Sequence, residues 1–371
     1  MKKKEVVKFY SLNKIMSYKA VYNVIYGERS NGKTYSVLKY GIEKYVKHQG
    51  QMGIIRRWEV DLKGKNGSVL FDALVANNEI SILTQGQWTD VYYYSKRWYF
   101  CRYDDETQKR EVADEPFAYA FSISNGEHDK STSYPNINTI LFDEFITRGQ
   151  YLPDEFVAYM NLLSTIIRHR DTVEIFMLAN TVNKYCPYFE EMGLKHIKEQ
   201  KQGTIDLYTY GESNLSVAVE YCSSLNKEGK PSDKYFAFDN PKLHMITGGA
   251  WEIDIYPHLP MKYRPQNVKF EYFIKFDDNT LHCEIIKIDR SYFTYIHEKT
   301  TSIKDLDRDL IYSPEYDARD NWRRNILHPI DVIDKRVLFF FKHDKVFYQD
   351  NEVGEIVRNY LLWCDTDSMK H

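Results

Sequence analysis

The stretch from Gly27 to Thr34 carries residue types that bind phosphate. It reads Gly-Glu-Arg-Ser-Asn-Gly-Lys-Thr, the G-x-x-x-x-G-K-T spacing of a Walker A phosphate loop. The glycines permit a tight turn in which backbone N–H groups converge on a phosphate, the lysine supplies a compact charge, and the threonine hydroxyl is a ligand for Mg²⁺. The pattern predicts binding of ATP with Mg²⁺; a chance glycine-rich turn is the alternative. The expected nucleotide-binding residues are Gly27, Arg29, Ser30, Asn31, Gly32, Lys33, Thr34 and Tyr35.

Two carboxylates follow a later apolar run, as in a Walker B strand. Residues 139–142 are Thr-Ile-Leu-Phe, and Asp143 and Glu144 come next. Asp143 is expected to join Thr34 at the Mg²⁺ ion, and Glu144 to polarise the water that attacks the γ-phosphate. The predicted strand 173–179, apolar apart from Glu174, ends at Asn180, for which we expect a contact to the γ-phosphate or to that water. A plain strand-end cap is the alternative for Asn180.

Alternating strand and helix patterns surround these residues. The run Val21–Tyr26 suits a buried strand, and the apolar positions from Tyr35 to about Lys47 suit a helix. Further strands are predicted at 51–58 and 173–179. A helix is predicted to open at Pro153 and to hold Arg168 and Arg170 in its last turn. This alternation predicts an α/β fold with a parallel sheet, and the strands expected between residues 91 and 122 predict an antiparallel insertion at its edge.

The pattern divides the chain into three predicted parts. They are a P-loop ATPase domain at 1–200, a linker or small connecting domain at 201–262, and an α+β domain at 263–371. In the last part we expect a three-strand meander between Val268 and Ile296. A hairpin formed by 337–341 and 345–348 is expected to follow, with a closing helix at about 353–363.

Composition narrows the possible partners. The chain has 371 residues, with 27 Lys+Arg against 25 Asp+Glu up to residue 200 and 23 against 28 beyond it, so the net charges are +2 and −5. This balance excludes a strongly basic face, so any nucleic-acid contact should come from a few local side chains. The sequence has no apolar run of about 18 residues and no secretion signal, so no membrane partner is expected. Its five widely spaced cysteines favour a reducing cytoplasm.

Several tracts together resemble the DNA-packaging ATPase of phi29-type tailed phages. The resemblance covers the first 200 residues well and the meander loosely. Tyr134-Pro135-Asn136, leading into the Asp-Glu strand, is more specific than either Walker motif. The other matching tracts are 27–34, 54–57, 130–133, 142–146, 162–170, 178–180, Asn183 and 187–189.

The resemblance implies a terminase-like P-loop ATPase of the ASCE class. Such a protein would form a homopentameric ring at the portal of a procapsid and pump double-stranded DNA into it. It would work in the host cytoplasm, transiently at the portal vertex, with a structural RNA as a further candidate partner. Arg168 matches the arginine finger that reaches the neighbouring subunit's ATP site, and Lys130 matches a DNA-facing lysine. Glu59 stands where the family has a basic residue, and Lys63 and Lys65 are nearby.

The resemblance further implies that the C-terminal domain is similar to an RNase H-type nuclease that has lost its metal site. A terminase with an active nuclease is the closest rival, and its candidate ligands are Asp277, Asp278, Glu284 and Asp289. A P-loop kinase would not need Glu144 beside the metal carboxylate. A GTP-dependent switch would need N-K-x-D, whereas residues 183–186 are Asn-Lys-Tyr-Cys. Arg168 could also be only a helix-end cation, like Arg170.

Overall fold

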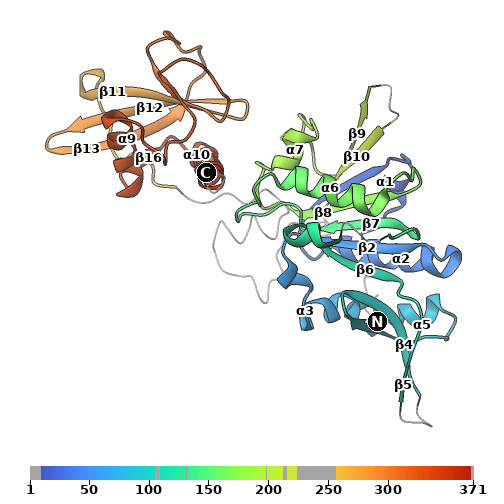
Figure 1. The fold of residues 1–371 in the computed structure, drawn as a ribbon. Helices are drawn as coiled ribbons and strands as arrows, with labels where there is room; N and C mark the ends of the chain where they lie inside the picture. The colour runs from blue at the N-terminus through green and yellow to red at the C-terminus, as the bar shows by residue number, and fades with distance from the viewer. Residues whose placement is uncertain are drawn as a thin grey trace, which may run out of the picture. The chain divides into compact units, whose positions relative to one another are not determined.

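The computed structural model describes residues 10–104, 109–129, 133–197, 199–211, 215–223 and 256–368. The chain divides into two compact units (Figure 1). The first comprises Met1–Arg148 and Asp154–Glu252, and the second comprises Gly149–Pro153 and Ile253–His371.

A ten-stranded sheet forms the centre of the first unit, in the order β3-β4-β6-β2-β7-β8-β1-β10-β9, with β5 attached to β4 (Figure 1). The strands from β6 to β10 along this order are parallel, which confirms the predicted α/β fold with a parallel sheet. Their bounds are β6 Ala118–Ser122, β2 Gln51–Arg56, β7 Ile137–Asp143, β8 Glu174–Asn180, β1 Tyr22–Gly27 and β10 Leu215–Tyr221.

Helices α2 (Lys33–His48) and α6 (Glu155–Ile167) connect strands of this sheet. Val37, Leu38 and Ile42 of α2 are buried, and the central strands are apolar almost throughout because parallel sheets are covered on both faces. The remaining helical segments of this unit are short. They are α1 Asn13–Met16, η1 Glu59–Leu62, α3 Lys65–Ser68, η2 Val69–Phe71, α4 Asp72–Ala76, α5 Glu79–Leu83, η3 Ile123–Asp129 and α7 Pro187–Glu191.

The predicted antiparallel insertion is present at one edge of the sheet, except that its third predicted strand, β6, belongs to the parallel sheet, where it pairs with β2. β3 (Asp90–Tyr94) and β4 (Arg97–Asp104) form a hairpin, β5 (Lys109–Val112) pairs with β4, and β4 pairs antiparallel with β6. Trp98 of β4 is fully buried, and its Nε1 donates to Gly67 O at 2.9 Å, which fastens the insertion to the helical segments before it.

The domain boundary predicted at residue 200 is wrong. β9 (Ile205–Tyr210) and β10 lie within the predicted linker, yet β10 pairs in parallel with β1, the strand that leads into the phosphate loop. The helix–strand alternation stops at this point of the sequence because the consecutive strands β9 and β10 pair antiparallel with each other. Residues 224–255 of the predicted linker lie outside the described residues.

The second unit contains a six-stranded sheet in the order β15-β14-β11-β12-β13-β16. The meander predicted here is confirmed as β11 (Val268–Phe276), β12 (Asn279–Ile288) and β13 (Ser291–Glu298). Three short strands join in parallel: β14 (Leu310–Tyr312) on β11, β15 (Trp322–Arg323) on β14, and β16 (Val346–Tyr348) on β13. A short 3-10 turn, η4 (Pro265–Asn267), precedes the meander, and the closing helix is α10 (Asn351–Ser368).

The hairpin predicted at 337–348 is wrong, because residues 337–341 belong to helix α9 (Val332–Lys342). Asp331 caps this helix by accepting hydrogen bonds from the N–H groups of Ile333 and Asp334. The Val-Leu-Phe-Phe-Phe run is apolar on successive positions, so its sequence fits either element. In the helix Val337 and Phe340 are buried, whereas Phe339 is exposed.

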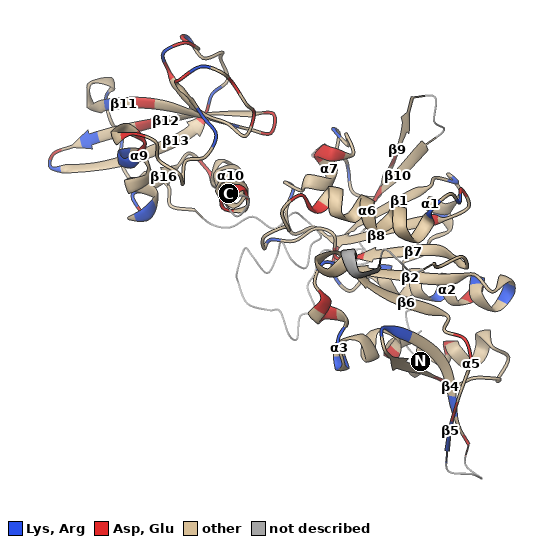
Figure 2. Cartoon of the chain, in the orientation of Figure 1, with Lys and Arg blue, Asp and Glu red and all other residues tan. Residues whose placement is uncertain are grey.

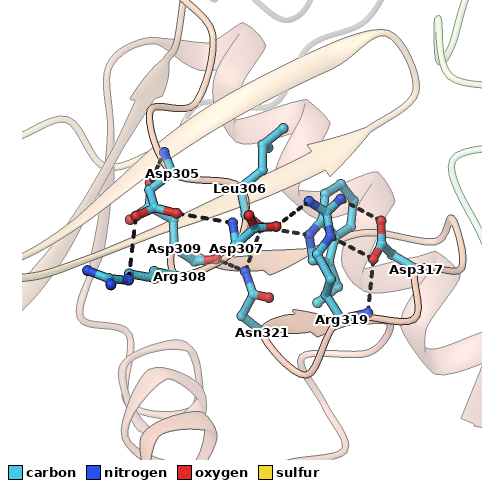
Figure 3. A network of polar contacts seen from close by, with 9 residues as sticks. Asp305, Leu306, Asp307, Arg308, Asp309, Asp317, Arg319 and Asn321 are labelled. Atoms are coloured by element: carbon cyan, nitrogen blue, oxygen red, sulfur yellow. Dashed lines mark hydrogen bonds and ion pairs between the residues drawn. The ribbon is translucent and has the colours of Figure 1, made fainter.

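A polar network orders the irregular connection after β13 (Figure 3). Arg319 donates to the Asp317 carboxylate at 2.7 and 2.9 Å and to Asp307 at 3.1 Å, while Asn321 Nδ2 donates to two backbone carbonyls. The Arg319 guanidinium thus neutralises the carboxylates of Asp307 and Asp317 in this acidic segment.

All five cysteines are buried, and none of them is joined in a disulfide. Burial raises the pKa of Cys101 to about 11 and that of Cys222 to about 12. Within the described residues, no helix has the length and apolar character needed to span a membrane.

Candidate active site

The phosphate loop leaves the C-terminal end of β1 and leads into α2. Gly32 has a φ of 90° and Ser30 a φ of 59°, so the loop backbone takes left-handed conformations that glycine adopts most readily. A Cβ atom on Gly27 would lie 2.9 Å from Cys222 Cβ, beside the neighbouring strand β10. The first glycine is therefore required by close packing as well as by the turn.

Lys33 is buried, and its ammonium group is folded onto the loop. Its Nζ donates to Glu28 O at 2.6 Å, to Asn31 Oδ1 at 3.2 Å and to Asn180 Oδ1 at 3.3 Å. Burial lowers the pKa of Lys33. All three acceptors are neutral, so a phosphate oxygen would be a stronger partner for this desolvated charge.

The other predicted loop residues differ in exposure. Arg29 and Ser30 are exposed, and Asn31 is buried. Asn31 Nδ2 has no hydrogen-bond acceptor in the described part of the chain beyond a weak approach to the Cys222 thiol. Tyr35 is half-buried and its hydroxyl donates to Glu79 Oε1 at 3.0 Å. Asn31 therefore retains donor capacity for a bound anion.

Asp143 ends β7 close to Thr34. Thr34 Oγ1 donates to Asp143 Oδ1 at 3.2 Å, and Arg56 Nη2 lies 2.7 Å from Asp143 Oδ2. Burial raises the pKa of Asp143, and Arg56 acts against this shift. The hydroxyl and the carboxylate are both oxygen ligands of the kind that Mg²⁺ prefers.

Glu144 follows with a φ of 63°, which is uncommon for a residue with a side chain. Its side chain is 62% exposed, and Arg56 Nη1 lies 2.7 Å from its Oε2. Asn180 ends β8, the strand between β1 and β7, and is paired with Gly27. The structure thus brings Lys33, Thr34, Asp143, Glu144 and Asn180 to one edge of the sheet.

Arg56 is a site residue to which the sequence assigns no role. It ends β2, which pairs with β7, so strand pairing delivers it to Asp143. The two arginines that end the predicted strand are the sequence feature that points to a role for Arg56.

Tyr10 is a second site residue to which the sequence assigns no role. Its N–H donates to Asn31 O, its carbonyl accepts from Ser36 Oγ, and its hydroxyl donates to Glu220.

Arg57 supports the site from within the core. Its Nε donates to both carboxylate oxygens of Glu155, at 3.0 and 2.8 Å, and the Tyr188 hydroxyl donates to the same carboxylate at 2.8 Å. Arg57 also donates to the carbonyls of Glu144 and Phe145, at 3.3 and 2.7 Å. The buried ion pair therefore holds the backbone that carries Glu144.

Arg168 lies away from this site within the same chain. Helix α6 connects the parallel neighbours β7 and β8, so its 13 residues lead back over about 20 Å to the opposite edge of the sheet. Arg168, at the end of α6, is exposed with a φ of 54°. Arg170 confirms the location, since its guanidinium donates to the carbonyls of Pro135 and Ile137 at the start of β7. Lys130 lies outside the described residues.

The carboxylates considered for a nuclease do not converge. Asp277 and Asp278 lie in the turn before β12, and Asp289 lies in the turn after it. β12 has ten residues, so about 30 Å of strand separates the two turns. Two-metal catalysis needs ions about 4 Å apart, which this arrangement does not provide.

The sequence pattern of the family described as Podovirus DNA encapsidation protein (Gp16) matches residues 4–202. The DNA packaging protein of Bacillus phage phi29 is 29% identical over 184 residues, or 49% of this chain and 49% of that protein. The DNA packaging protein of Bacillus phage B103 is 30% identical over 185 residues, or 48% and 50%. The matched part of the chain thus spans about half the length of these curated relatives.

Two solved structures show a similar fold over most of the chain. One is entitled "The Phi-28 gp11 DNA packaging Motor", with a TM-score of 0.52 and 18% identity, covering 96% of this chain and 98% of that one. The other is "The bacteriophage Phi-29 viral genome packaging motor assembly", with a TM-score of 0.53 and 20% identity, covering 95% and 96%. At these identities the similarity shows the fold alone.

Proposed function

Because the chain belongs to the Podovirus DNA encapsidation protein (Gp16) family, we propose that it hydrolyses ATP with Mg²⁺ to drive double-stranded DNA into a procapsid. The observation that carries the proposal is the convergence of Lys33, Thr34 and Asp143. Lys33 and Thr34 lie on the phosphate loop, and Thr34 Oγ1 lies 3.2 Å from the carboxylate that ends β7. A phosphate-binding loop beside a strand-end carboxylate is the arrangement that phosphoryl transfer requires.

The residues present suit Mg²⁺ and ATP. Thr34 and Asp143 supply hard oxygen ligands, and the loop offers backbone N–H groups, Lys33 and the Asn31 amide to the phosphates. When bound, Mg²⁺ neutralises charge that develops on the phosphate oxygens. Asp143 has to exchange Arg56 for the ion, and Lys33 has to turn from the Glu28 carbonyl to a phosphate.

Each catalytic residue acts on a different group. Glu144 polarises the attacking water, and its exposed carboxylate is open to that water. Asn180, bonded to Lys33 here, is placed to orient the γ-phosphate or the water. Arg168 lies at the opposite edge of its own sheet, so a role in hydrolysis requires that it serve a neighbouring subunit.

The strand orders of the two units also agree with the fold classes that the family resemblance implies. Strand β8 lies between the phosphate-loop strand and the Walker B strand, which supports the ASCE class. In the second unit the order β15-β14-β11-β12-β13, with β12 antiparallel to its neighbours, supports an RNase H-type fold. The separation of Asp277 and Asp289 supports the loss of the two-metal nuclease site of that fold.

We further assign the chain to a pentameric ring at the portal, in the host cytoplasm, with a structural RNA as a candidate partner. Basic and acidic residues are interspersed over both units (Figure 2). This distribution supports DNA binding through a small number of side chains. Lys130 is the residue that we propose to contact the DNA.

The decisive experiment measures ATP hydrolysis by the full chain with and without double-stranded DNA. Hydrolysis should require Mg²⁺, rise with DNA, and disappear in Lys33→Ala. Lys44→Ala, which changes a lysine on the same helix that is paired with Glu174, is the matched control. ATP turnover that does not respond to DNA, with the γ-phosphoryl group transferred to a small acceptor in place of water, would support a kinase. Metal-dependent cutting of plasmid would support an active nuclease.

A further inference from the structure

Two adjacent strands of the second unit place imidazole and carboxylate groups on one face of the sheet. His282 and Glu284 lie two residues apart on β12, and His297 lies directly opposite His282 on β13. One potential ligand atom of each residue lies within 4.8 Å of the others. The pairing of β12 with β13 thus fixes the relative positions of the three residues.

The distances suit a single metal ion. His297 Nε2 lies 3.6 Å from Glu284 Oε2, and the His282 and His297 ring centroids are 4.9 Å apart. Tetrahedral coordination with bonds of about 2.0–2.1 Å separates ligand atoms by about 3.4 Å, so small side-chain rotations would complete it. The three side chains are 12–26% exposed, which leaves a path from solvent.

Hydrogen bonds outside the cluster orient its members. His297 Nδ1 lies 3.0 Å from Glu298 O, and a carbonyl can only accept, so Nδ1 carries the proton. The lone pair of the neutral ring is then on Nε2, which faces Glu284. His282 Nε2 lies 2.9 Å from Glu271 Oε2, and the Tyr263 hydroxyl donates to Glu284. Metal-bound histidines and carboxylates are commonly held by such outer contacts.

We propose that His282, Glu284 and His297 bind one divalent transition-metal ion of the zinc type, with water completing its coordination. Two imidazoles and one carboxylate favour Zn²⁺, Co²⁺ or Ni²⁺ over Mg²⁺, which prefers all-oxygen sites. The proposal rests on the second unit alone and is independent of the proposed ATPase activity.

The test uses the full chain, stripped with a chelator and titrated with Co²⁺ without nucleotide or DNA. The parent should develop the intense visible absorption of four-coordinate Co²⁺, which one equivalent of Zn²⁺ should abolish. His297→Gln and Glu284→Gln should weaken binding by at least about 100-fold, the upper end of what losing an outer contact costs. His258→Gln, an exposed histidine on the same unit, is the matched control and should titrate like the parent.

Two further measurements separate loss of ligand from loss of fold. Zn²⁺ should raise the melting temperature of the parent and of His258→Gln but not of His297→Gln, whose melting temperature in chelator should equal the parent's. His297→Cys should regain binding and add a cobalt–thiolate band in the near ultraviolet. Equal titrations of parent, His297→Gln and control, or no tetrahedral spectrum in the parent, would overturn the site and leave a hydrogen-bonded ion pair.

Discussion

Arg56 Nη2 lies 2.7 Å from Asp143 Oδ2, while Nη1 of the same guanidinium lies 2.7 Å from Glu144 Oε2. One arginine thus bridges the carboxylate proposed for metal binding and the carboxylate proposed as general base. Because β2 and β7 are neighbours, the bridge is built into the order of the strands. Any cation that binds Asp143 must replace one end of it.

Arg56→Gln should move the acid limb of Mg²⁺-dependent ATP hydrolysis to higher pH. Burial raises the pKa of Asp143, and Arg56 opposes that rise, so the variant's carboxyl stays protonated to a higher pH. Activity falls as Asp143 gains a proton, so the loss should begin earlier as pH decreases. The measurement is kcat/KM against pH at a fixed Mg²⁺ concentration below saturation, with the exposed Arg102→Gln as control. An unchanged acid limb would contradict the role assigned to Arg56.

Glu144→Gln should retain ATP binding while hydrolysis falls by about 10²–10⁴, the usual contribution of a positioned general base. The amide keeps the size of the side chain but cannot accept the water proton. Nucleotide affinity and single-turnover hydrolysis are measured on the same preparation, with the exposed Glu111→Gln as control. Hydrolysis at the parent rate would show that Glu144 is not the base.

The sequence predicted Lys33, Thr34 and Asp143 because each belongs to a local pattern, a loop of fixed spacing or the end of an apolar strand. Arg56–Asp143 and Arg57–Glu155 could not be found in this way. Their partners are 87 and 98 residues apart in the chain, and they meet only because of a strand order that local periodicity does not define. The helix at 337–341 could not be predicted for a different reason. Five consecutive apolar residues show neither the 3.6-residue repeat of a helix nor the two-residue repeat of a strand.

Removing one partner of the buried pair Arg57–Glu155 should be costly. Glu155→Leu leaves the guanidinium buried without its counterion, which typically destabilises a protein by about 3–5 kcal/mol. Adding Arg57→Met should recover part of that stability, because it removes the buried charge, while the Tyr188 hydroxyl and the carbonyls of Glu144 and Phe145 still lose their bonds to this pair. Urea unfolding measures both. Hydrolysis should remain low in the double variant, since Arg57 no longer holds the carbonyls of Glu144 and Phe145.

Arg168 and Arg170 should respond differently when subunits are mixed. Arg168→Ala mixed with Glu144→Gln should recover some hydrolysis, because some interfaces would pair an intact arginine with an intact site. A trans arginine is worth about 10³–10⁵ in rate where a partner supplies it. Arg170→Ala should instead lower stability, since Arg170 bonds backbone carbonyls in its own chain, and mixing should not repair that loss. Lack of recovery for Arg168→Ala, with rings confirmed by mass, would leave it a helix-end cation.

Lys130→Ala should weaken the salt dependence of DNA binding. Each phosphate contact changes log K by roughly 0.9 per unit of log salt, so a grip of about five contacts gives a slope near −4 to −5. The variant should show a shallower slope and lose stimulation by DNA while basal hydrolysis persists. Lys47→Ala, on α2, is the control. An unchanged slope would show that Lys130 does not contact the DNA, and Lys63 and Lys65 would be the next residues to test.

The burial of every native cysteine makes the chain well suited to site-specific fluorophore attachment. Maleimides react with thiolates, and the raised pKa values of Cys101 and Cys222 leave those groups protonated at neutral pH, while the buried positions of Cys186, Cys283 and Cys364 restrict reagent access. A cysteine introduced on an exposed strand, for example Glu111→Cys, should therefore label much faster than all five. Dye-tagged protein for single-molecule work can be made from the natural background, with no need to replace the cysteines that pack in both cores.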